Sequence, residues 1–91
     1  MLKAILNFFK KIFIKRVTFI GRGGLNFSST DGNTYFIDSE LLSIKEFDII
    51  VFSDSVEKLS SNSVLNGIQK QEIIAELEEE LKRMGLKIKF E

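Results

Sequence analysis

The sequence predicts an α+β fold, in which a small, mainly antiparallel sheet of about five strands is backed by a C-terminal helix and accompanied by an additional N-terminal amphipathic helix. Residues 66–84 carry apolar side chains at helical spacing and are followed by Gly85, which suits a helix end. Residues 31–33 (DGN) separate two β-prone segments, as in a tight hairpin. Residues 2–15 place apolar side chains on one helical face and lysines on the other. The length of 91 residues predicts a single domain.

The β-rich part of the chain, residues 16–60, is rich in β-branched and aromatic side chains between turn signals. The expected strands are residues 16–20, 25–28, 34–37 and 47–52. Residues 47–52 (FDIIVF) form the most hydrophobic run, which predicts a central strand covered on both faces. Residues 38–42 are expected to leave the sheet as a turn or one helical turn. Residues 53–63 are expected to form a loop, alone or with one short edge strand.

The C-terminal unit has the clearest local pattern. Asn66 can cap the helix of residues 66–84, with the Gln69 side chain reaching back to it. The expected apolar stripe is Ile73, Ile74, Leu77, Leu81 and Met84. Two i,i+4 ion pairs are expected on the exposed side, Glu78 with Lys82 and Glu79 with Arg83. After Gly85, apolar and charged side chains alternate over residues 86–91, which predicts a half-buried last strand.

The N-terminal segment is basic and apolar, but lysines interrupt it at positions 3, 10 and 11. No apolar stretch has the length of a signal-peptide core or of a membrane span. A basic amphipathic helix over residues 2–15 can pack on its own domain, or it can lie on an anionic membrane surface. Both alternatives remain open at this stage.

The chain contains no histidine and no cysteine, so the usual proton shuttle, thiol nucleophile and soft metal ligands are missing. Its carboxylates show no spacing that indicates an acid–base pair. The turn at residues 21–24 (GRGG) lacks the Lys-Ser/Thr and the helix that would follow in a phosphate-binding loop. We therefore expect no enzyme, no cofactor and no metal site. The lack of cysteine also fits a cytoplasmic location.

Charge is sorted along the chain although the formal net charge is zero. Residues 1–24 contain six basic side chains and no acidic one, whereas residues 31–58 contain seven acids and two lysines. Asp48 is the one carboxylate inside a segment predicted to be buried, so it either points out at an edge or makes a structural hydrogen bond. Such sorting indicates a charged partner.

In their order and spacing, several segments resemble immunity family seventy-four, a family of small immunity proteins from bacterial polymorphic toxin and contact-dependent growth inhibition systems. The resemblance spans residues 17–91. The segments that carry it are residues 31–42 (DGNTYFIDSELL), residues 47–52 (FDIIVF) with 54–56 (DSV), residues 72–74 (EII), and residues 82–90 (KRMGLKIKF). The resemblance implies a protein without catalytic residues that binds a cognate toxin domain, often a nuclease, and neutralises it in the cytoplasm.

Nuclease surfaces are basic because they hold phosphates, so an acidic segment would complement them. The candidate partner-binding residues are Asp38, Glu40, Glu46, Asp54 and Glu57. The acidic face of the C-terminal helix, Glu72, Glu76, Glu79 and Glu80, is either solvated or a second docking surface. Two alternatives belong to other classes: a peripheral membrane adaptor anchored by residues 2–15, and a small nucleic-acid-binding accessory protein. The pI of about 6.3 argues against direct nucleic-acid contact. The oligomeric state and the activity of the toxin stay open.

Overall fold

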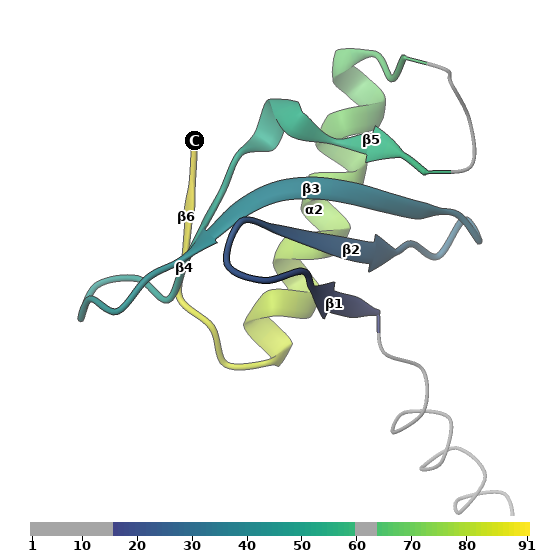
Figure 1. Ribbon diagram of the computed structural model, residues 1–91. Helices are drawn as coiled ribbons and strands as arrows, with labels where there is room; N and C mark the ends of the chain where they lie inside the picture. The colour runs from purple at the N-terminus through teal and green to yellow at the C-terminus, as the bar shows by residue number, and fades with distance from the viewer. Residues whose placement is uncertain (1–15, 60–63) are drawn as a thin grey trace, which may run out of the picture.

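The computed structural model describes residues 16–59 and 64–91 (Figure 1). The predicted helix over residues 2–15 lies outside these residues. The described chain has α+β structure, as predicted. Its elements in chain order are β1 (Val17–Phe19), β2 (Gly24–Ser28), β3 (Thr34–Leu41), β4 (Ile49–Val51), the 3-10 turn η1 (Ser53–Ser55), β5 (Glu57–Lys58), α2 (Gly67–Arg83) and β6 (Ile88–Phe90).

The sheet has six strands rather than about five, in the order β1-β2-β3-β4-β6, with β5 paired to β3. Every pairing is antiparallel except β4 with β6, which is parallel. The parallel pair follows from the connection, because the chain crosses over through α2 before it returns beside β4. The sheet is therefore mainly antiparallel, as predicted.

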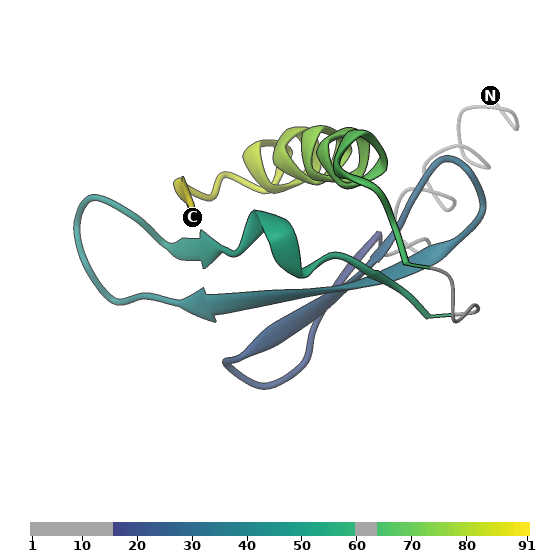
Figure 2. The same ribbon diagram turned by 90° about the horizontal axis from the view of Figure 1, so that it is seen from above.

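Helix α2 covers one face of the sheet (Figure 2). The core lies between the two layers, where Leu77 and Leu81 of α2 are fully buried. The sheet contributes side chains that alternate along its strands: Val17, Leu25, Phe27, Tyr35, Ile37, Ile49 and Val51. In the part of the chain that the structure describes, no second layer covers the opposite face of the sheet. The described residues thus form two layers, one sheet and one helix, and they leave one surface of the sheet uncovered.

Strand β3 is longer than predicted, and the expectation that residues 38–42 leave the sheet is wrong. The strand continues to Leu41 and pairs with β4, with Ser39 opposite Val51. Side chains still alternate at this end: Ile37 and Ser39 are buried, whereas Asp38 is exposed. The sequence did not show this alternation clearly, because the inward-facing residue Ser39 is small and polar rather than apolar.

Strand β4 is central in the sheet, as expected, but the expectation that it is covered on both faces is wrong. Ile49 and Val51 are fully buried against α2, whereas Ile50 is half-buried on the opposite face. A strand that is buried on both faces needs a covering layer on each side of the sheet, and the described residues provide one such layer, helix α2.

The segment after β4 forms a 3-10 turn and a short edge strand, which agrees with one of the two predicted alternatives. At η1 the chain stops pairing with β3, and the Ser55 hydroxyl makes a hydrogen bond to β3 in place of a paired strand residue. Its Oγ accepts a hydrogen bond from the Asp38 N–H (2.8 Å) and donates to the Phe52 carbonyl (2.6 Å). Strand β5 then resumes pairing beside Phe36. Ser55 therefore fixes β3 at the position of Asp38.

The ends of α2 are as predicted. Asn66 Oδ1 accepts from the Gln69 N–H (2.8 Å), and Gln69 Oε1 accepts from the Asn66 N–H (3.0 Å), which completes a capping box. At the other end Gly85 has φ of 82°, a left-handed conformation that favours glycine. The Leu86 N–H donates to the Leu81 carbonyl (3.1 Å), so the chain turns directly into β6.

Asp48 makes a structural hydrogen bond, the second of the two alternatives. Its Oδ2 accepts from the Lys87 N–H at 2.7 Å, and the Asp48 N–H donates to the Lys87 carbonyl at 2.8 Å. These two bonds hold the start of β4 against the segment that enters β6. Asp48 therefore has a structural role: it holds the start of β4 beside the segment that precedes β6.

Glu76 joins α2 to the hairpin between β2 and β3. Its carboxylate accepts from the Ser29 hydroxyl (2.8 Å), the Thr30 N–H (3.0 Å) and the Thr30 hydroxyl (2.7 Å). Burial acts to raise the pKa of Glu76, but these three bonds outweigh it and leave the pKa below its ordinary value. In the same hairpin the Tyr35 hydroxyl donates to Asp31 at 2.6 Å. Burial, with that bond, raises the pKa of Tyr35 to about 12.

Candidate functional site

The face of the sheet opposite α2 is the candidate site, and we call it the open face. The strand register places on it Thr18, Asn26, Phe36, Asp38, Glu40, Ile50, Glu57 and Lys89. The assignment follows from pairing, since residues opposite each other on neighbouring strands point to the same side and neighbours along a strand alternate. The core residues occupy the other set of positions.

Three of the five predicted partner-binding residues meet on the open face. Asp38 and Glu40 lie two positions apart on β3, a separation of about 7 Å along a strand. Glu57 on β5 lies directly opposite Phe36, which is two positions before Asp38. All three carboxylates are exposed. Asp38 and Glu57 are neighbours of Phe36 on this face, whereas Glu40 lies two positions beyond Asp38, opposite Ile50 of β4.

These three carboxylates have no cationic partner among residues 16–59 and 64–91. The ion pairs within 4 Å in this part of the chain join Lys82 to Glu78, Arg83 to Glu80 and Lys89 to Glu91. Lys89, the lysine that the register places on the open face, is thus already paired with Glu91. None of the three carboxylates is therefore in an ion pair within 4 Å in the described chain.

Phe36 is held in place by a glycine on the neighbouring strand. A Cβ atom at Gly24 would come within 2.6 Å of Cε2 and 2.7 Å of Cζ of the Phe36 ring, so the ring edge occupies the space above Gly24. Gly24 lies opposite Asp38, which brings the ring toward that carboxylate. Phe36 remains half-buried rather than covered.

Asn26, which lies opposite Phe36, carries an unpaired hydrogen-bond acceptor. Its Oδ1 is buried and has no hydrogen-bond partner among the described residues. A buried acceptor without a donor keeps its full partial charge in a medium of low dielectric. An unpaired buried acceptor of this kind costs free energy, because it has lost its hydrogen bonds to water.

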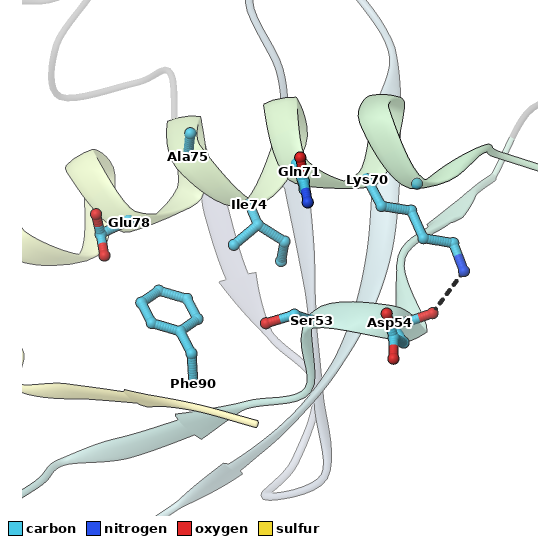
Figure 3. A pocket seen from close by; sticks show the side chains of 9 residues that line it. Ser53, Asp54, Lys70, Gln71, Ile74, Ala75, Glu78 and Phe90 are labelled. Carbon is cyan, nitrogen blue, oxygen red and sulfur yellow. Dashed lines mark hydrogen bonds between the residues drawn. The ribbon is translucent and has the colours of Figure 1, made fainter.

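The other two predicted residues lie elsewhere. Glu46 is exposed in the connection between β3 and β4, beyond the ends of the strands. Asp54 belongs to η1 and lines a groove on the α2 side of the sheet (Figure 3). Lys70 of α2 donates from Nζ to the Asp54 carbonyl at 2.8 Å across this groove. Neither residue joins the surface formed by Asp38, Glu40 and Glu57.

The groove in Figure 3 has a volume of about 460 Å³ and an apolar floor. Ile74 and Ala75 of α2 line it from the helix, and Phe90 of β6 lines it from the sheet. The charged groups at its rim are of both signs, Asp54 and Glu78 with Lys70. The groove therefore combines both signs of charge at its rim, in contrast to the acidic cluster on the open face.

The acidic face of α2 is partly used inside the protein. Glu76 holds the hairpin, and Glu80 pairs with Arg83 at 3.3 Å. The predicted pair of Glu79 with Arg83 is therefore replaced by an i,i+3 pair, whereas the predicted pair of Glu78 with Lys82 is present at 3.7 Å. Glu72 and Glu79 remain exposed.

Phe36 and Asn26 belong to the open face but were not predicted as members of the site. A signal was present for Phe36, because residues 34–41 alternate and place it with Asp38 and Glu40. No local signal points to Asn26, whose position depends on its pairing with β3. No three carboxylates converge as ligands of one metal ion within the described ranges.

The described residues themselves are the basis for a proposed function, because similarity to known proteins supplies none. No helix in residues 16–59 or 64–91 is long and apolar enough to cross a membrane. No family model, curated protein or solved structure matches this chain.

Proposed function

We propose that this protein is an immunity protein that binds a cognate bacterial toxin domain with a basic surface, such as a nuclease, and neutralises it by occupying that surface. The observation that supports the proposal best is that Asp38, Glu40 and Glu57 lie on the open face with no ion-pair partner among residues 16–59 and 64–91. The resemblance of residues 17–91 to immunity family seventy-four points in the same direction.

The electrostatics of the open face suit such a partner. Like charges on neighbouring positions of one sheet face repel each other, so the isolated protein carries an unfavourable interaction there. A basic surface would replace this repulsion with attraction and would also accelerate association. The sheet provides a rigid base, because each strand is held by its neighbours and by the layer of α2.

The proposal predicts that charge reversal on the open face weakens toxin binding. The test variant is Asp38→Lys with Glu57→Lys, and the matched control is Glu46→Lys with Asp54→Lys, which makes the same change in net charge away from the face. The toxin domain encoded by a neighbouring reading frame is the ligand, and its affinity is measured by calorimetry at low and high salt. We expect a loss of at least about tenfold for the test variant and a smaller loss for the control.

Salt dependence supplies a second readout. Wild-type affinity should fall as salt screens the exposed charges, and the test variant should lose that dependence. Equal affinity of wild type and test variant at both salt concentrations, with both proteins folded, would show that the open face is not the toxin-binding surface.

A further inference from the structure

We infer that the centre of the open face, at Phe36, receives an arginine side chain of the bound partner. This inference rests on the proposed function and makes it more specific, since it names the partner group and its place. The contact would combine one aromatic ring with two carboxylates, Asp38 and Glu57, and we call these three residues the arginine platform.

The geometry of the platform comes from the sheet. Asp38 follows Phe36 by two positions on β3, and Glu57 faces Phe36 from β5. Cross-strand neighbours have Cβ atoms about 4.5–5.5 Å apart, and neighbours on one face of a strand lie about 7 Å apart. A cation above the ring can therefore reach a carboxylate on either of two sides.

The ring is positioned before any partner arrives. Because the absence of a side chain at Gly24 leaves room for the Cε2–Cζ edge, the Phe36 ring leans toward β2 and lies over Gly24, the residue opposite Asp38. The ring stays half-buried, so part of its surface remains open to a ligand.

The chemistry favours arginine over lysine. A guanidinium group is planar and can stack on an aromatic ring while its N–H groups donate to carboxylates at its edge. An ammonium group is a compact charge that is strongly hydrated and stacks less well. Carboxylates alone would attract both cations, so the aromatic ring is the element that distinguishes them.

The experiment measures that distinction with defined probes. The full-length ¹⁵N-labelled protein is titrated with hexa-arginine and with hexa-lysine, peptides of equal charge, and both affinities are obtained from NMR shifts. We expect hexa-arginine to bind about fivefold tighter, as a partly solvated cation–π contact would give, with the largest shifts at Phe36, Asp38 and Glu57.

Two variants at position 36 distinguish the effect of the aromatic ring from the effect of apolar volume. Phe36→Leu keeps an apolar side chain but removes the ring, and the ratio of the two affinities should fall to about one while hexa-lysine binding changes little. Phe36→Tyr keeps a ring and should keep the preference. Thermal unfolding of both variants shows whether the sheet is intact.

The outcomes separate this inference from the proposed function. An arginine preference that is the same in wild type and Phe36→Leu, or shifts confined to α2, would overturn the platform while leaving the charge-reversal test unaffected. If instead the reversed variant Asp38→Lys with Glu57→Lys binds the toxin as wild type does, the proposed function fails, whatever the peptides show.

Discussion

Replacement of Leu77 by alanine should lower the free energy of unfolding by about 2 to 5 kcal/mol. Leu77 is fully buried in the middle of α2, where the helix lies on the sheet. The sheet beneath it is fixed by its own pairings, so the cavity left by the substitution cannot close without moving whole strands. The loss therefore combines the transfer of the removed methyl groups with a cavity that persists.

Denaturant unfolding, followed by circular dichroism, measures this loss directly. Met84→Ala is the matched control, because Met84 was predicted to belong to the same apolar stripe but is 48% exposed at the helix end. The control should change stability by less than about 0.5 kcal/mol. A similar, small effect at both positions would mean that α2 does not pack on the sheet as described.

Replacement of Glu76 by alanine should cost about 1.5 to 3 kcal/mol, toward the lower end because Thr30 is exposed. The substitution removes three hydrogen bonds to a charged acceptor and leaves the Ser29 hydroxyl without the acceptor for its proton. Ser29 is 8% exposed, so water can replace that partner only in part. The hairpin between β2 and β3 would then be released from α2.

The pH dependence identifies the carboxylate as the cause. The folded state lowers the pKa of Glu76, so its contribution is present above the pKa of the unfolded chain, about 4.5, and is lost as pH falls through the folded value. Asp31, whose pKa the Tyr35 hydroxyl lowers, acts in the same direction. Glu76→Gln should therefore be less stable than wild type at pH 7, with a smaller difference near pH 3. An equal difference at both pH values would contradict this account.

The helix and its two ends were predictable because their signals are local. Asn66, Gln69 and Gly85 each act within one turn of the positions they stabilise, so a short stretch of sequence contains the whole interaction. The hairpin turn at residues 31–33 is local in the same sense. These elements are confirmed at the predicted places, with Gly32 at φ of 89°.

The sheet beyond the hairpin was less predictable, because its interactions join distant segments. Ser39 looks like a surface residue until Val51 is known to lie opposite it. The hydrogen bond from the Asp38 N–H to the Ser55 Oγ, which holds β3 in place, spans 17 positions. The parallel pairing of β4 with β6 likewise depends on the path of α2 rather than on either strand.

The candidate site was predictable only in part, because it also depends on which strands pair. The acidic residues were recognised from composition, but composition cannot separate Asp38, Glu40 and Glu57 from Asp54 and Glu46. Strand register does so, because it decides which face each side chain occupies. Because this strand was expected to end at residue 37, the sequence did not predict that Asp38 and Glu40 lie on the same face of the sheet.

The measurement that tests the central claim most directly is the footprint of the toxin domain on the ¹⁵N-labelled protein, recorded by NMR in the complex. We predict that the largest changes fall on open-face residues, at Asn26, Phe36, Asp38, Glu40 and Glu57, with little change along the exposed side of α2. Changes confined to Glu72, Glu79 and their neighbours on α2, with the open face unperturbed, would contradict the claim that this sheet surface binds the toxin.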